Sequence, residues 1–211
     1  MTSFAEPVVL RRGGTAADAP VVVLLHGRGA DEMSIMALAD HLPAGPEYVA
    51  VRAPIAEGGG FAWFANRGIG RPVAESLAET MSWFREWLDA ELPAGPDGRK
   101  VVLVGFSGGA AFAGGLILSD PSRYAGVAIL YGTLPFDAGV PITPGRLTDT
   151  PMFVAQGETD TVIPRELLDA TWHYLTTDAH PRTATWREPG GHLLTAEAAA
   201  ALNAWLTAVL G

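Results

Sequence analysis

The chain has 211 residues, of which 48% are hydrophobic and 18% are charged, a composition typical of a globular protein with a full hydrophobic core. Its formal net charge of -9 argues against nucleic acid as a partner, because binding phosphates requires clustered Lys and Arg. The absence of cysteine excludes a disulfide framework, a thiolate nucleophile and a metal held by Cys ligands.

Residues 1–14, MTSFAEPVVLRRGG, contain no apolar stretch long enough for a signal peptide. The longest apolar runs further along, such as VVVLL at 21–25, have the length of a strand and cannot cross a bilayer. We therefore expect a cytoplasmic protein without stable membrane insertion. Its length predicts a single domain over residues 1–211.

Short apolar runs alternate with longer amphipathic runs along the chain. The apolar runs predict strands at 6–12, 21–26, 48–51, 100–106, 125–132, 151–157 and 183–188, the first of them an edge strand. The amphipathic runs predict helices at 31–42, 73–92, 108–119, 164–176 and 195–210. This alternation predicts a three-layer α/β sandwich with a mostly parallel central sheet. Ligands bind at the carboxyl edge of such a sheet, where the Pro/Gly-rich stretches 57–72 and 132–151 are expected to lie.

The segment VVLVGFSGGAAF, residues 101–112, runs from a buried strand through a cluster of glycines into a helix. It contains the pattern G-x-S-x-G, with Ser107 at the sharp turn between strand and helix. Such a turn exposes a nucleophilic hydroxyl, and side chains at Gly105 and Gly109 would collide with the neighbouring strand and helix. The alternative is that Ser107 only caps the helix that follows.

A serine hydroxyl needs a base to take its proton, and the chain has five histidines. His192, in REPGGHLL, follows the last predicted strand, so its loop returns to the carboxyl edge where Ser107 lies. Three others fall in predicted helices or in a polar connection: His41, His173 and His180. We expect His192 to be the base. The alternative is His26, at the end of an early strand, but an imidazole there would crowd the oxyanion site, so we expect His26 to brace that loop.

A carboxylate must orient the imidazole, and the segment PMFVAQGETDTVIP, residues 151–164, offers two. We choose Asp160, because the apolar residues that follow it can anchor it while it turns inward. Glu158 is the closest alternative and is expected to be solvated, and Asp137 and Asp149 are weaker rivals. The chain order Ser, Asp, His is that of α/β-hydrolases.

Acyl transfer also needs N–H donors for the oxyanion. One is expected to be the backbone N–H of Gly108, directly after the nucleophile. The other is expected from the loop after the strand at 21–26, in HGRGADE, and we assign it to the backbone N–H of Arg28. The glycines of this loop could suggest phosphate binding, but the chain has no G-x-G-x-x-G or Walker pattern.

The segments LLHGRGADE, RAP with FAWF, GFSGGA, GETDTVIP and GGH, taken together and in this order, resemble the phospholipase/carboxylesterase family of α/β-hydrolases, which includes the acyl-protein thioesterases. The resemblance implies a Ser107–Asp160–His192 triad and an oxyanion hole from the amides of Gly108 and Arg28. It also implies esterase activity on small or lysophospholipid-like esters, often in homodimers. In one departure, many members carry Gln or Asn directly after the serine, where this chain has Gly108.

The resemblance further implies that Trp63 and Phe64 lie beside the serine and line the acyl pocket, and Leu134, Ile163 and Leu193 are further candidates. The alternative is that the two aromatic residues are core anchors under a long loop. Residues 133–150 hold several prolines and glycines and no amphipathic helical run, so they predict an open site without a substantial lid.

The sequence therefore predicts a serine carboxylester hydrolase that acts on a small-molecule ester and needs no cofactor or metal. A lactone or dienelactone hydrolase is an alternative, although those relatives typically use a cysteine nucleophile, which this chain lacks. An inactive binding protein of the same fold is another. A metallohydrolase is disfavoured, because the sequence has no H-x-x-x-H pattern and no His/Asp cluster.

Overall fold

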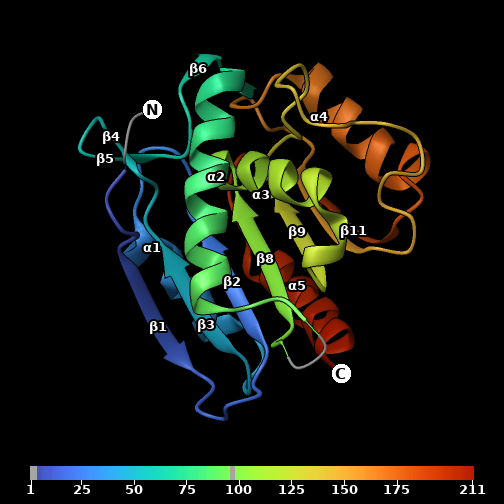
Figure 1. Ribbon diagram of the computed structural model, residues 1–211. Coiled ribbons are helices and arrows are strands. Elements are labelled where there is room, and N and C mark those ends of the chain that lie inside the picture. The colour runs from blue at the N-terminus through green and yellow to red at the C-terminus, as the bar shows by residue number, and fades with distance from the viewer. Residues whose placement is uncertain (1–3, 96–97) are drawn as a thin grey trace.

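Seven strands form one sheet, in the order β1-β3-β2-β8-β9-β10-β11, in a computed structural model that describes residues 4–95 and 98–211 (Figure 1). The strands span Val9–Gly13 (β1), Val21–Leu25 (β2), Glu47–Val51 (β3), Val101–Phe106 (β8), Gly126–Leu130 (β9), Pro151–Gly157 (β10) and Arg182–Glu188 (β11). All neighbours are parallel except β1, which runs antiparallel to β3 at one edge. The predicted mostly parallel sheet is confirmed.

Helices cover both faces of the sheet (Figure 1). On one face lie α2 (Ala74–Glu91) and α3 (Gly108–Ser119), which pack on inward-facing residues of the central strands. On the other lie α1 (Glu32–Met36) with a following 3-10 turn, η1 (Ala37–His41), and α5 (Ala196–Leu210). The helix α4 (Arg165–His173) continues into a π-helical turn, η3 (Tyr174–Asp178), whose Tyr174 and Leu175 join the core of the α2 and α3 face. The predicted three-layer sandwich is thus confirmed.

Two parts of the chain differ in detail from the sequence-based prediction. The stretch 31–42 forms α1 and then η1 instead of one helix. The stretch 57–72 is not a plain loop, because it holds most of two small hairpins, β4 (Ile55–Glu57) with β5 (Gly60–Ala62) and β6 (Asn66–Gly68) with β7 (Arg71–Pro72). The first hairpin turns at Gly58 and Gly59, both with positive φ, as a tight two-residue turn requires.

The parallel strands bring the segments that follow them to the carboxyl edge of the sheet, which is uppermost in Figure 1. They include the loops that follow β2, β8, β10 and β11 and the two small hairpins that follow β3. The connection between β9 and β10, residues 131–150, also leaves from this edge and contains turns but no helix or strand. In the part of the chain that the structure describes, no helix is both long enough and apolar enough to span a bilayer.

Candidate active site

Ser107 stands in a strained backbone conformation between β8 and α3, with φ 54° and ψ -113°. A side chain at Gly105 would collide with the backbone of Gly109, and a side chain at Gly109 would collide with the carbonyl group of Leu25 at the end of β2. Only glycines therefore allow strand, turn and helix to approach so closely. Ser107 precedes the first turn of α3, but its side chain makes no capping hydrogen bond, which argues against the helix-cap alternative.

The Ser107 hydroxyl is joined to His192 and Asp160 in one hydrogen-bonded chain. His192 Nε2 lies 2.8 Å from Ser107 Oγ, and His192 Nδ1 lies 2.8 Å from Asp160 Oδ2. The Asp160 side chain is fully buried, and its Oδ1 accepts hydrogen bonds from the backbone amides of Val162 (2.8 Å) and Ile163 (3.1 Å). One carboxylate oxygen is thus fixed by the backbone while the other faces the imidazole.

The competing carboxylates take no part in these hydrogen bonds. Glu158 is exposed, two residues before Asp160, in the same loop. Asp137 and Asp149 both stand at positive φ in the long connection between β9 and β10. The hydrogen bond to His192 therefore favours Asp160 over all three.

Glu188, at the end of β11, fixes both ends of the loop that carries His192. Its carboxylate accepts hydrogen bonds from the hydroxyl of Tyr131, from Thr195 Oγ1 (2.8 Å) and from Trp186 Nε1 (3.2 Å). Partial burial acts to raise the pKa of Glu188, but these hydrogen bonds outweigh it and the pKa is lowered. Sequence reasoning missed this cluster, because its members are far apart in the chain and form no motif.

The backbone amides of Arg28 and Gly108 come together beside Ser107. A Cβ placed on Gly108 would lie 3.3 Å from the Arg28 backbone nitrogen, and both residues border the same cavity as Ser107. The Arg28 side chain holds this loop in place, since its guanidinium pairs with Glu57 and donates to the carbonyl oxygen of Phe64 (3.1 Å). The structure thus brings the two amides together beside Ser107, and their role as oxyanion donors stays a prediction.

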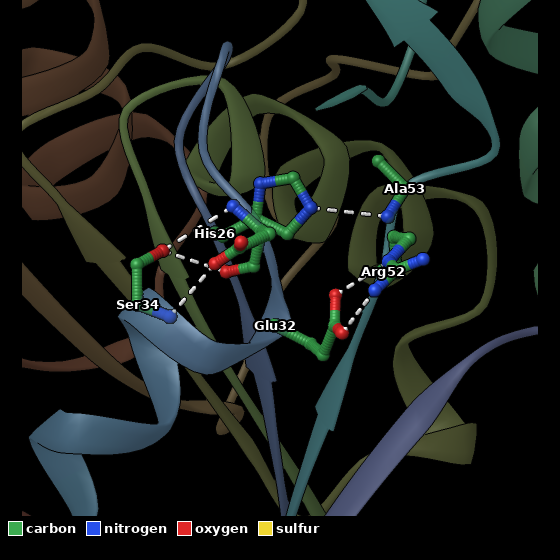
Figure 2. A network of polar contacts seen from close by, with 6 residues as sticks. His26, Glu32, Ser34, Arg52 and Ala53 are labelled. Atoms are coloured by element: carbon green, nitrogen blue, oxygen red, sulfur yellow. Dashed lines mark hydrogen bonds and ion pairs between the residues drawn. The ribbon is translucent and has the colours of Figure 1, made fainter. Parts of the chain in front are cut away.

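His26 directly follows β2, at the start of the same loop; it is buried, and Figure 2 shows its ring directed toward Ala53. Its Nε2 accepts a hydrogen bond from the backbone amide of Ala53 (3.0 Å), so its Nδ1 carries the proton and donates to the carbonyl oxygen of Gly27 (2.7 Å). Figure 2 also shows the neighbouring ion pair of Glu32 and Arg52, with 2.7 Å between Glu32 Oε2 and Arg52 Nε. His26 is hydrogen-bonded as the predicted brace and is not paired with Ser107.

The buried imidazole makes stability depend on pH. Burial lowers the pKa of His26 below its usual 6.5. The Gly27 hydrogen bond and the charges of Asp31 and Glu32 act to raise this pKa, but burial is the larger effect. As pH falls below 6.5, His26 therefore becomes protonated in the unfolded chain while it stays neutral in the folded chain. We expect the free energy of unfolding to fall there, with a slope approaching about 1.4 kcal/mol per pH unit, the limit for one proton.

Urea unfolding of the wild type and of His26→Gln, measured above pH 5 where most carboxylates are still ionised, checks this expectation. The variant should show a flatter dependence of unfolding free energy on pH, whereas His41→Gln, at an exposed histidine, should follow the wild type. Equal slopes for wild type and His26→Gln would contradict the assignment.

A cavity of about 390 Å³ opens in front of Ser107 and His192, and its lining includes Phe64 and Ile163. Trp63 does not line it: it is 1% exposed, stacks on Phe112 and donates to the carbonyl oxygen of His26 (2.8 Å). It is a core anchor, which was the alternative for both aromatic residues.

The predictions for Leu134 and Leu193 are also wrong for this cavity. Leu134 is fully buried, and its side chain packs against α3 at Gly114 while its backbone amide donates to Thr171 Oγ1 (3.0 Å). Leu193 is 67% exposed and faces a neighbouring hollow instead. The lining that sequence reasoning missed includes Asn66, Ile69, Phe106, Thr133 and Val162. Ile69 is an apolar residue in a glycine-rich polar stretch, and this contrast was a usable sign that it lines a cavity.

Within residues 4–95 and 98–211, no group of three or more His, Cys, Asp or Glu side chains is arranged to hold a metal ion.

Known proteins resemble this chain over nearly its whole length. A sequence profile of the phospholipase/carboxylesterase family matches residues 11–209. MhqD of Bacillus subtilis (strain 168) is 26% identical over 189 residues, which cover 88% of this chain and 91% of MhqD. Among solved structures, a Bacillus cereus carboxylesterase has a TM-score of 0.82 at 22% identity and covers 97% of this chain and 95% of its own. A carboxylesterase from Mesorhizobium loti has a TM-score of 0.81 at 23% identity, and the match covers 96% of this chain and 99% of the other. The chain therefore belongs to the phospholipase/carboxylesterase family of α/β-hydrolases and is an enzyme of the carboxylesterase type.

Proposed function

We propose that the enzyme hydrolyses short to medium acyl esters through an acyl-enzyme on Ser107, with His192 as general base and acid and Asp160 as the group that orients it. The observation that carries the proposal is the hydrogen-bonded chain from Ser107 Oγ through His192 to Asp160. A hydroxyl within 2.8 Å of an imidazole nitrogen is placed to lose its proton as it attacks a carbonyl carbon.

In the first step, Ser107 Oγ bonds to the ester carbonyl carbon and its proton passes to His192 Nε2. The negative charge on the former carbonyl oxygen faces the amides of Arg28 and Gly108, which stabilise it. The bond to the alcohol oxygen then breaks, and that oxygen takes the proton from His192. Asp160 stabilises the imidazolium that exists between these transfers.

In the second step, water attacks the acyl-enzyme while His192 takes one of its protons. The bond to Ser107 Oγ breaks, the carboxylic acid leaves and His192 returns the proton to Ser107. Atoms and charges balance without a cofactor, and the triad ends as it began.

The cavity supports short to medium acyl groups as substrates. Its volume is at the lower end of the range for small-molecule sites, and its walls include Phe64, Ile69, Val162 and Ile163. Each buried methylene contributes about 0.8 kcal/mol, so affinity should grow with acyl length until the cavity is full. The absence of a helix in residues 131–150 supports an open site that works on dissolved substrate.

A series of p-nitrophenyl esters of increasing acyl length, with lysophospholipids and acyl-thioesters alongside, tests this proposal. We expect kcat/KM to rise with acyl length, to reach a plateau at medium chains, and to show no jump above the solubility limit of the substrate. Hydrolysis of long-chain triglyceride that accelerates sharply once an emulsion forms would contradict the open site. No turnover on any ester or thioester would contradict the proposed function itself.

A further inference from the structure

A second hollow of about 380 Å³ lies beside the catalytic cavity, on the side of the His192 loop. Its walls come from α1 and η1, from the residues directly after His192 and from the start of α5, and they include Ile35, Ala37, Leu193 and Ala196.

The two cavities share a wall. Phe106 lines both, and its ring centroid lies 5.2 Å from that of His192. The Phe106 ring also lies close to the loop after β2, since a Cβ placed on Gly27 would lie 3.2 Å from its Cδ1 atom. His192 lines the first cavity and Leu193, the next residue, lines the second. The hollow therefore begins directly beyond Phe106 and the His192 loop, next to the cavity that contains Ser107.

The chemistry of the proposed reaction places one half of the substrate on that side. The leaving oxygen must approach His192 Nε2 to receive its proton, so the alcohol half of the ester departs on the imidazole side of Ser107. We propose that the hollow is the subsite for the alcohol half of the ester, or for the thiol half of a thioester. This inference rests on the proposed function, with the acyl half in the cavity lined by Phe64 and Ile163.

The lining favours an apolar alcohol over a polyhydroxylated one. Two of its polar side chains are already engaged, because Ser34 Oγ donates to the carbonyl oxygen of Asp31 (2.7 Å) and Thr195 Oγ1 donates to Glu188 (2.8 Å). Leu193 presents an exposed apolar side chain at the entrance, and His41 is the remaining polar member of the lining. An alkyl chain would cover this surface without leaving a hydrogen-bonding group unpaired.

Two isomeric esters separate this subsite from the acyl cavity. Hexyl acetate places its long chain in the alcohol half, and ethyl hexanoate places it in the acyl half. Ala196→Phe and Ala37→Phe each add a ring to the hollow from an exposed position, the first on α5 and the second on η1. Since each buried methylene is worth about fourfold in affinity, we expect either variant to lower the ratio of kcat/KM for hexyl acetate to that for ethyl hexanoate by about tenfold.

The matched control is Ala90→Phe, an exposed alanine on α2, which should leave the ratio at the wild-type value. Equal losses on both esters, or no loss on hexyl acetate in either filled variant, would overturn the subsite. A loss of dimers in sedimentation with an unchanged ratio would also overturn it, because the hollow would then be an interface between copies. If the wild type hydrolysed neither ester, the proposed function would fail before this inference is reached.

Discussion

Ser107→Ala and His192→Ala are each expected to lower kcat for ester hydrolysis by about 10⁴- to 10⁶-fold, and the double variant should lose little more than either one. Without the hydroxyl no acyl-enzyme can form, and without the imidazole the hydroxyl keeps its proton. The two groups touch, with 2.8 Å between Nε2 and Oγ, so they act as one unit and their effects cannot be additive in free energy.

Steady-state kinetics of the two single variants and the double variant, with melting temperatures to show that each is folded, check this expectation. His173→Ala, at an exposed histidine on α4, is the matched control and should keep wild-type turnover. If the losses of the single variants multiplied in the double variant, the two residues would be working independently and the proposed mechanism would be wrong.

Asp160→Asn is expected to lower kcat by about 10⁴-fold while the enzyme stays folded. An asparagine keeps the oxygen that accepts from the amides of Val162 and Ile163, so the loop should survive. Its amide N–H₂ would face His192 Nδ1 as a donor, which favours the tautomer with the proton on Nε2. That nitrogen could then no longer accept the proton of Ser107.

Glu158→Gln changes the neighbouring carboxylate in the same loop and serves as the matched control. Glu158 is exposed and contributes its backbone, not its side chain, to the contact with Glu188. We expect its kcat to stay near that of the wild type. The opposite ranking of the two variants would show that Glu158, and not Asp160, is the carboxylate that orients His192.

The sequence predicted the sheet well because its strands are covered on both faces. Runs such as Val21–Leu25 and Val101–Phe106 are apolar at successive positions, and a long apolar run can be recognised without knowledge of its partners. The short strands between Ile55 and Pro72 could not be recognised, because strands of two or three residues are set by their hairpin partners and by the turns at Gly58, Gly59 and Gly70.

The positions of the candidate triad residues could be predicted because each follows a strand of a parallel sheet, and topology brings such residues to one edge. The residues that line the cavity could not be predicted in the same way, because the lining depends on the direction of each side chain. Trp63 and Phe64 are adjacent, yet one points into the core and the other into the cavity. Leu134 was misassigned for the same reason, since it follows a strand at the correct edge but packs down onto α3.

The measurement that tests the central claim most directly is covalent labelling with a fluorophosphonate, followed by mass spectrometry of the intact enzyme and of its peptides. A serine activated by His192 should take up one label, located on Ser107, and lose esterase activity in proportion to labelling. The His192→Ala variant should label far more slowly. A label on another residue, or full hydrolysis by an enzyme that carries the label on Ser107, would contradict the account.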